Sequence, residues 1–326
     1  MAAQHPKPSI VAFKHFNVES DAQTLRDAMK GMGTDEDTII EIMCARNYEQ
    51  ISAIKKSFQQ MFGRVLADDL KSELGGKFEK VILKLLMSPM EQMATTLRNA
   101  VKGAGTDETA IIEIMCTSTN EELAEIKAAY KTLFKHDLMK DLVDDTSGDF
   151  KRLLVSMSAG DRDQGGQDLS EAEAMSYAQK LFDAGEGKVG TDEEAFNMVM
   201  ARRGFHQLRQ IFHAYDRNLS PENGIVKAIK SEFSGSIKEA YVATAVTALE
   251  GREAYLADQL YQSMKGLGTN DNQLIRLITS RSEMDLKGIA VQFLKRHEKT
   301  LEEFVVDDTS GDYGKCLLAL VKGNAQ

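Results

Sequence analysis

The sequence predicts an all-α fold made of four homologous repeats, each about 70 residues long. A glycine-rich segment occurs four times, the apolar residues after each copy follow helical spacing, and no segment sustains the alternation of apolar and polar residues typical of a strand. With 326 residues the chain is long enough for two domains or for one repetitive array. The internal repetition favours the array.

The glycine-rich segments define the repeats. They are Met29–Glu36 (MKGMGTDE), Val101–Glu108 (VKGAGTDE), Gly185–Glu193 (GEGKVGTDE) and Met264–Asp271 (MKGLGTND). The last glycines of the four segments are Gly33, Gly105, Gly190 and Gly268, which are 72, 85 and 78 residues apart. The longest interval indicates extra residues between the second and third repeats.

Two helices are predicted after each glycine segment. Six and ten residues after the last glycine the chain is apolar in every repeat, as one face of a helix requires. These residues are Ile39 and Met43, Ile111 and Met115, Phe196 and Met200, and Leu274 and Ile278. A second helix has its own apolar face, which includes the aromatic residues Phe58, Tyr130, Tyr215 and Phe293. Thr34, Thr106, Thr191 and Thr269 are expected to be the N-caps of the first helix, and residues 65–74 and 78–87 to form short helices.

The boundaries follow from the repeats and from composition. We expect a head at 1–17, repeats at 18–88, 89–158, 171–246 and 247–326, and a linker at 159–170. Pro89 marks the seam between the first two repeats. The linker is rich in Gly, Asp and Gln and is expected to divide the molecule two repeats by two, and the head, with Pro6 and Pro8, is expected to be loosely held.

Composition limits the function. Forty Lys and Arg against 50 Asp and Glu give a net charge of −10, so nucleic acid and anionic membrane should repel the chain unless a cation bridges them. The 42% hydrophobic and 28% charged residues are typical of a folded soluble protein. Residues 1–8 lack the apolar core of a signal peptide, and no uncharged stretch approaches the ~20 residues of a membrane span. We therefore expect a cytoplasmic protein.

The three cysteines are given no chemical role. Cys44, Cys116 and Cys316 are too few and too dispersed for a disulfide framework or a zinc site. Cys44 and Cys116 share one position in their repeats, eleven residues after the last glycine and next to core methionines. Small buried hydrophobic side chains are the favoured interpretation.

An acidic residue recurs at a fixed distance from each glycine segment. Glu73, Asp145 and Asp308 lie 40 residues after their last glycine, and Glu232 lies 42 residues after it, with a two-residue insertion near Ser220 and Pro221. Each begins a similar tetrapeptide: ELGG, DTSG, EFSG and DTSG in chain order. Sharp glycine turns can aim carbonyl oxygens at one point, and a carboxylate adds two more oxygens. Oxygen ligands of this number suit Ca²⁺, whereas zinc would require His or Cys.

Other interpretations of these motifs remain open. A single KGxGT segment is a plausible tight turn between helices, and DTSG a plausible helix end followed by an N-cap, in which case the chain is a helical-repeat scaffold that binds protein partners. Four paired copies favour a metal loop. Asp161–Gly166 (DRDQGG) lacks the position-twelve glutamate of an EF-hand, where Ala172 stands, and Gly185–Gly190 has Val189 where a phosphate-binding loop needs Ser or Thr. An enzyme is not expected.

The combined signature resembles that of the annexins over about residues 18–321. The resemblance rests on KGxGTDE, an acid about 40 residues later, and four such units. It implies five short helices per repeat and a curved disc that carries the calcium loops on its convex face. The implied Ca²⁺ ligands are three carbonyls and one carboxylate per repeat: Met29, Gly31, Gly33 and Glu73; Val101, Gly103, Gly105 and Asp145; Gly185, Lys188, Gly190 and Glu232; Met264, Gly266, Gly268 and Asp308. Thr34 with Glu36, and Thr106 with Glu108, resemble the accessory calcium positions of the family.

The chain departs from the family pattern at two places. Arg46, Arg203 and Arg281 occupy one repeat position and are expected to form structural ion pairs, but the second repeat has Ser118 there, and Met93 stands at the place of the usual acidic partner. A channel role is therefore doubtful. Some relatives carry a tryptophan at the position of Val189, and this chain has no tryptophan, so its third loop should insert less deeply into a bilayer.

The resemblance implies calcium-dependent binding to acidic phospholipid membranes such as those containing phosphatidylserine. Lys30, Lys102, Lys188 and Lys265 lie beside the loops, either to contact phosphates or as solvated side chains. The expected function is peripheral and reversible organisation, trafficking or repair of membranes when calcium rises. A protein partner of the head and a homo-oligomer on the membrane are further expectations, and nucleic acid is not expected as a partner.

Overall fold

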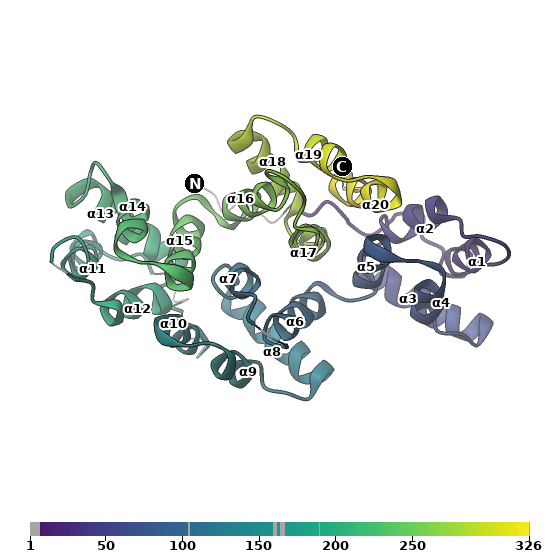
Figure 1. Cartoon of the computed structure of the whole chain (residues 1–326), viewed down its shortest axis with the longest axis horizontal. Helices are drawn as coiled ribbons and strands as arrows, with labels where there is room; N and C mark the ends of the chain where they lie inside the picture. The colour runs from purple at the N-terminus through teal and green to yellow at the C-terminus, as the bar shows by residue number, and fades with distance from the viewer. Residues whose placement is uncertain (1–6, 104, 159–161, 164–166, 189, 326) are drawn as a thin grey trace. The chain divides into compact units, whose positions relative to one another are not determined.

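The computed structural model of the chain describes residues 7–103, 105–158, 162–163, 167–188 and 190–325. These residues form twenty α-helices and no strand, five helices in each repeat (Figure 1). The all-α class and the five-helix repeat expected from the sequence are confirmed. None of the helices in the described part is long and apolar enough to span a membrane.

The repeats share one order of helices. The first repeat contains α1 (Val18–Ala28), α2 (Glu36–Met43), α3 (Tyr48–Phe62), α4 (Leu66–Glu73) and α5 (Gly76–Leu85). The second contains α6 (Pro89–Ala100), α7 (Glu108–Met115), α8 (Asn120–Phe134), α9 (Leu138–Asp145) and α10 (Gly148–Ser158). The third contains α11 (Glu171–Ala184), α12 (Glu193–Arg202), α13 (Phe205–Asn218), α14 (Gly224–Glu232) and α15 (Gly235–Glu250). The fourth contains α16 (Arg252–Met264), α17 (Asp271–Arg281), α18 (Leu286–His297), α19 (Leu301–Asp308) and α20 (Gly311–Lys322).

Local signals set the ends of the helices. Helix α3 begins with a capping box between Asn47 and Gln50 and ends at Gly63, whose φ of +63° is the left-handed conformation that glycine adopts freely. Helix α13 ends differently, at Leu219 with φ of −114°, and the two-residue insertion expected near Ser220 and Pro221 follows it. Helices α11 and α19 also begin with capping boxes.

The core is the one that the repeat alignment predicts. The aromatic residues of the second helix face, Phe58, Tyr130, Tyr215 and Phe293, are all 0% exposed. The residues predicted for the first helix are also buried, from Ile39 and Met43 to Leu274 and Ile278. Cys44 and Cys116 are buried as expected. Each fully buried aromatic or aliphatic side chain contributes roughly 1.5–3 kcal/mol of hydrophobic stabilisation.

The chain divides into two units that do not follow the order of the repeats. Unit 1 is residues 1–92 with 256–326, and unit 2 is residues 93–255. In unit 1, helices α2 and α5 of the first repeat pack on α17 and α20 of the fourth. In unit 2, the equivalent helices α7 and α10 pack on α12 and α15. The expectation that the linker separates repeats two by two is wrong, because the repeats on either side of it bury their faces against each other.

The head is also better held than expected. The N–H groups of Ser9 and Ile10 donate to the carbonyl of Ser282 at 2.8 and 2.9 Å, and the N–H of Asn324 donates to the carbonyl of Ser9 at 2.9 Å. Ser9 and Ile10 are buried. The expectation of a loose head is therefore wrong for these residues, while residues 1–6, like 159–161 and 164–166 of the linker and EF-hand-like segment, lie outside the described part.

Candidate calcium loops

The three regular glycine loops have one backbone geometry. Each is closed by a backbone hydrogen bond. The N–H of the residue after the threonine donates to the carbonyl that lies two residues before the loop lysine: Asp35 to Ala28 at 2.9 Å, Asp107 to Ala100 at 2.9 Å and Asn270 to Ser263 at 2.7 Å. Both glycines of every loop have positive φ, between +89° and +123°. This region favours glycine, which explains why a KGxG sequence is required here. Such a sharp double turn is the backbone that several carbonyl ligands of one ion need.

The third loop is one residue longer. Its closing hydrogen bond runs from Asp192 to Ala184 at 2.8 Å. Gly190 has φ of +84°, like the last glycine of the other loops, but Gly185 has φ of −124°. A Cβ atom on Gly187 would lie 2.9 Å from the carbonyl oxygen of Phe182, so glycine is needed there for space. Val189, which was expected to replace a tryptophan found in some relatives, lies outside the described residues.

The structure brings every predicted acid to its glycine loop. In each repeat the threonine after the last glycine donates its hydroxyl to the carboxylate that lies about 40 residues later. Thr34 Oγ1 is 3.1 Å from Glu73, Thr106 Oγ1 is 2.7 Å from Asp145, Thr191 Oγ1 is 3.2 Å from Glu232, and Thr269 Oγ1 is 2.5 Å from Asp308. Two segments far apart in sequence thus meet in all four copies.

The threonines are not the N-caps that the sequence predicts. The cap is the next residue, Asp35, Asp107, Asp192 or Asn270, whose side chain accepts from the backbone N–H three residues on. The helix therefore begins one residue later than expected. This shift leaves the threonine hydroxyl available to hold the acid, which is the function that the sequence pattern did not reveal.

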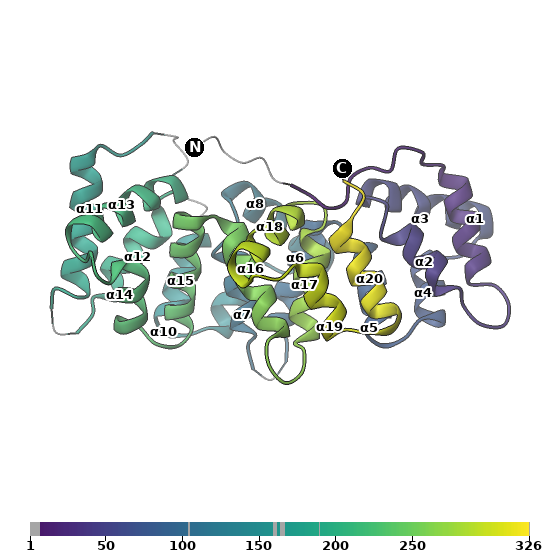
Figure 2. The same cartoon turned by 90° about the horizontal axis from the view of Figure 1, so that it is seen from above.

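The four acids precede a second set of turns. Gly76, Gly148, Gly235 and Gly311, the last residues of the tetrapeptides, have φ between +58° and +63° and begin α5, α10, α15 and α20. In unit 1, the α1–α2, α4–α5, α16–α17 and α19–α20 connections lie along one edge (Figure 2). In unit 2 the α9–α10 and α14–α15 turns line one cavity, so they also lie on one side of that unit. Each unit therefore presents its loops and acids on one side.

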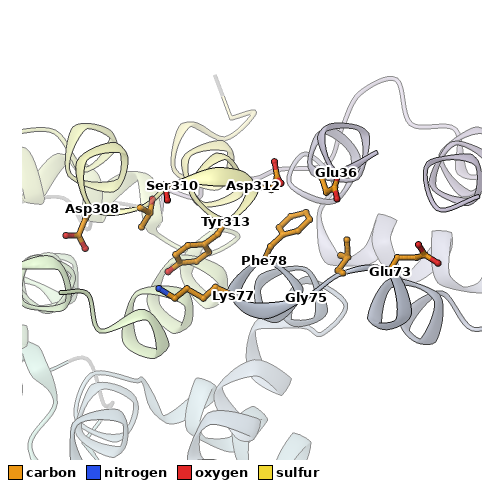
Figure 3. A pocket seen from close by; sticks show the side chains of 11 residues that line it. Glu36, Glu73, Gly75, Lys77, Phe78, Asp308, Ser310, Asp312 and Tyr313 are labelled. Carbon is orange, nitrogen blue, oxygen red and sulfur yellow. The ribbon is translucent and has the colours of Figure 1, made fainter. Parts of the chain in front are cut away.

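A cavity lies between the turns that follow the two acids of each unit. In unit 1 it has a volume of about 430 Å³ and lies between the Glu73 turn and the Asp308 turn, with the side chains of Lys77, Phe78 and Tyr313 between them (Figure 3). In unit 2 a cavity of about 380 Å³ is lined by the Asp145 turn and by Ser234 and Ser236, which follow Glu232. The turns that follow the two acids of each unit thus line one cavity.

Lys77 is a residue of this region that the sequence reasoning missed. Its Nζ is 2.6 Å from the Asp271 carboxylate and 5.5 Å from the centre of the Tyr313 ring. Burial raises the pKa of the Tyr313 hydroxyl, with Asp271 adding to the effect, so this phenol stays protonated. Lys77 does not recur at the same position of the other repeats, so no internal alignment signals it. A second cavity of about 820 Å³ in unit 2, which includes Lys188 and Arg202, was also not predicted.

The tips of the first and fourth loops are exposed. Met32 and Leu267, between the two glycines of their loops, have exposures of 106% and 108%, so no part of either side chain is covered. Lys30, Lys102, Lys188 and Lys265 are exposed as well. Lys188 Nζ is 3.8 Å from Asp192, and Lys265 Nζ lies 5.4 Å from the Tyr261 ring. Apolar tips flanked by lysines are suited to the boundary between water and a lipid bilayer.

The oxygen atoms available at each loop fit a hard cation that is held mainly by backbone carbonyls. Among the described residues, no group of three or more His, Cys, Asp and Glu side chains could hold a metal. A metal at these loops would therefore take carbonyl oxygens and the single carboxylate, which is chemistry suited to Ca²⁺. Glu36 and Glu108, of the predicted accessory positions, line the unit 1 and unit 2 cavities respectively.

The three arginines that share one position in their repeats pair as expected. Arg46 Nε is 2.6 Å from Asp21, Arg281 Nε is 2.7 Å from Asp285, and Arg203 is 3.4 Å from Asp163. Arg203 also donates to the Tyr177 hydroxyl at 2.5 Å. Met93 and Ser118, at the places of the missing pair, are both buried and uncharged. Their joint replacement leaves no lone charge at either position.

Fold, loops and acids together define a class: all-α proteins of four repeats with paired glycine and carboxylate turns. The annexin family model matches the chain four times, over residues 20–85, 92–157, 176–244 and 255–320. The chain belongs to the annexin family. Annexins are calcium-dependent phospholipid-binding proteins, so the family, cofactor and general function expected from the sequence are confirmed at the level of the family.

Individual relatives agree over most of the chain. Annexin A13 of Homo sapiens is 44% identical over 98% of this chain and 100% of its own length, and annexin B10 of Drosophila melanogaster is 44% identical over 97% and 98%. Annexin A7 of Homo sapiens is 45% identical over 94% of this chain, which spans only 62% of that relative. Among solved structures, chicken annexin V has a TM-score of 0.92 at 42% identity and covers 98% of this chain and 100% of its own. Calcium-bound annexin (Sm)1 has a TM-score of 0.83 at 31% identity, with 98% and 93% covered.

Proposed function

We propose that this chain docks on acidic phospholipid through Ca²⁺ held at four sites, each made of three backbone carbonyls and one carboxylate. The carbonyl donors are those of Met29, Gly31 and Gly33 in the first repeat and of the matching residues in the others, and the carboxylates are Glu73, Asp145, Glu232 and Asp308. The observation that supports this most directly is the hydrogen bond between the loop threonine and the distant acid in every repeat.

The charge of each site explains why lipid is needed. One carboxylate leaves a bound Ca²⁺ with a net charge of about +1, and the exposed loop leaves room for more oxygen ligands. Phosphate or carboxylate oxygens of a headgroup supply them and cancel the remaining charge. By linkage, lipid then raises calcium affinity by the same factor by which calcium raises lipid affinity. Four weak contacts acting together give tight attachment that a chelator reverses.

The remaining expectations are proposals of the same kind. We propose a binding role rather than a catalytic one, a cytoplasmic protein that moves to membranes when calcium rises, and a partner-binding role for the head. Support for the first comes from the family, and support for the second from the net charge of −10, which disfavours anionic lipid without calcium. Assembly into homo-oligomers on the membrane is a proposal that chemical cross-linking on and off vesicles would test.

Sedimentation with phosphatidylserine vesicles tests the site assignment. The fourfold variant Glu73→Gln, Asp145→Asn, Glu232→Gln and Asp308→Asn should lose calcium-dependent sedimentation and keep its helical circular dichroism. The control variant Glu41→Gln, Asp144→Asn, Asp168→Asn and Glu222→Gln removes the same charge from exposed positions outside the loops. It should sediment like the parent chain.

Two results would reject the proposal. Equal sedimentation of the site variant and the parent would show that these carboxylates are not ligands. Failure of the parent itself to sediment with calcium would favour the alternative, a helical-repeat scaffold whose glycine loops are only connections.

A further inference from the structure

Two cysteine thiols that are distant in sequence face each other inside unit 1. Cys44 follows the last turn of α2, Cys316 lies in the middle of α20, and their Sγ atoms are 3.1 Å apart. The two side chains are 3% and 0% exposed. Because a disulfide has an S–S length of about 2.05 Å, the two sulfurs need to approach by only about 1 Å to bond.

We propose that Cys44 and Cys316 form a reversible disulfide that joins the first repeat to the fourth, with a peroxide as the oxidant. In the first step one thiol sulfur attacks a peroxide oxygen, the O–O bond breaks, and a sulfenic acid and one water are produced. In the second step the other thiol attacks the sulfenic sulfur, the S–O bond breaks, and a second water leaves. Two thiols lose two electrons, and one hydrogen peroxide is reduced to two waters.

The helices that carry the two thiols are held in register independently of them. Helix α2 packs directly on α20. On the surface of this contact, Lys315 of α20 forms an ion pair of 2.8 Å with Asp37 of α2. The packing keeps each thiol beside the other, so a sulfenic acid on one cysteine meets its partner before it meets a thiol from solution.

Burial controls the rate at which this pair reacts. Desolvation raises the pKa of the Cys316 thiol well above its ordinary value, and the neighbouring Cys44 adds to the effect. The thiolate is the nucleophile, so oxidation of the closed structure is slow at neutral pH and faster at alkaline pH. The pair therefore resists brief exposure to oxidant, and the bond, once formed, is shielded from reducing thiols in solution.

Unit 2 contains a natural control. Cys116 holds in the second repeat the position that Cys44 holds in the first, and α7 packs on α15 as α2 packs on α20. Cys316 lies eight residues after Asp308, but Ala240 lies eight residues after Glu232. Cys116 is instead beside Thr244, and burial raises its pKa to about 12. Cys116 is thus as buried as Cys44 but has no second cysteine at the position that corresponds to Cys316. We expect it to stay reduced.

Oxidation of the full chain with hydrogen peroxide, followed by alkylation in denaturant and peptide mapping, tests the proposal. The parent has three free thiols, and we expect one to remain, on Cys116, with a single linked peptide that contains Cys44 and Cys316. The intact mass should fall by two hydrogens and return on reduction. The oxidised form should also unfold at a higher temperature, because the bond closes a long loop between the repeats.

Three variants make the result specific. Cys116→Ala should form the same link, whereas Cys44→Ala and Cys316→Ala should form none. If either of the last two fails to fold, the peptide map of the parent and of Cys116→Ala still decides the matter. Three alkylated thiols after treatment, sulfinic or sulfonic acid at Cys44 or Cys316 without a link, or a link that includes Cys116 would each overturn the proposal.

Discussion

Replacing the last glycine of each loop by alanine should weaken calcium binding without loss of fold. Gly33, Gly105, Gly190 and Gly268 have φ between +84° and +91°, and a Cβ atom added to any of them meets nothing within 4 Å. The cost is therefore conformational alone, about 1–2 kcal/mol for an L-residue in this region. Since 1.4 kcal/mol corresponds to tenfold, each site should lose about 5- to 30-fold in affinity.

The cost falls mainly on the calcium-bound state. The tips of the first and fourth loops carry few contacts that would hold the strained backbone in the absence of an ion, as the full exposure of Met32 and Leu267 shows. The free loop can relax, but the carbonyl of residue 33 must return to the left-handed geometry to bind. The strain therefore appears as lost affinity rather than as lost stability.

Calcium-dependent sedimentation with phosphatidylserine vesicles measures the effect. If four ions bind together, the losses in calcium affinity at the four sites multiply. The calcium concentration at half-maximal sedimentation then rises by the fourth root of that product. Gly33→Ala alone should raise it about 1.5- to 2.3-fold, and the fourfold variant about 5- to 30-fold.

Gly63→Ala is the matched control. Gly63 has φ of +63° and nothing within 4 Å of an added Cβ, but it ends α3 and lies outside every calcium loop. The same substitution should lower the free energy of unfolding by about 1 kcal/mol and leave the calcium midpoint unchanged. A fourfold loop variant with an unchanged calcium midpoint would refute the reasoning.

Three further predictions concern single interactions. Thr269→Val removes the donor that orients Asp308 and should raise the calcium midpoint about 2- to 3-fold by the same fourth-root relation, while Thr269→Ser leaves the midpoint unchanged; equal midpoints for both would contradict a positioning role. Arg281→Met removes the buried ion pair between Arg281 and Asp285 and should cost about 3–5 kcal/mol in urea denaturation, most of which a second substitution, Asp285→Leu, should recover; a loss below 1 kcal/mol would speak against this. Burial raises the pKa of Glu283 above 4.5, so the stability it contributes is present below that pH and is lost as pH rises through the raised value. Glu283→Gln should therefore raise the denaturation midpoint at pH 7 and not at about pH 4, and the opposite pattern would exclude the assigned direction.

The repeat architecture could be predicted because its sequence pattern occurs four times. Periodic apolar positions identified the buried residues from Ile39 to Ile278, and a nearly constant spacing linked each acid to its glycine loop. A single copy would have supported only a helix and a turn. The internal alignment supplied the long-range information, since a spacing of 40 residues in three copies and 42 in the other implies that both segments serve one local structure.

Features that occur once had no such signal. Lys77 lies beside the Glu73 turn, yet the other repeats have different residues there. The pairing of the first repeat with the fourth depends on which apolar faces match in shape, which spacing does not reveal. The contact of Cys44 with Cys316 follows from that pairing, so it too was hidden. The threonines were misassigned because a hydroxyl before a helix suits both a cap and a tether, and only the position of the acid decides between them.

The division of the chain has a consequence for its synthesis. Unit 2 is one continuous stretch, residues 93–255, and can complete its own packing as soon as it leaves the ribosome. Unit 1 combines residues 1–92 with 256–326, so its first half must wait, with the faces of α2 and α5 uncovered, until α17 and α20 have been made. We expect premature association with other nascent chains to occur mainly at these uncovered faces. Chaperones that act during translation should bind there for the same reason.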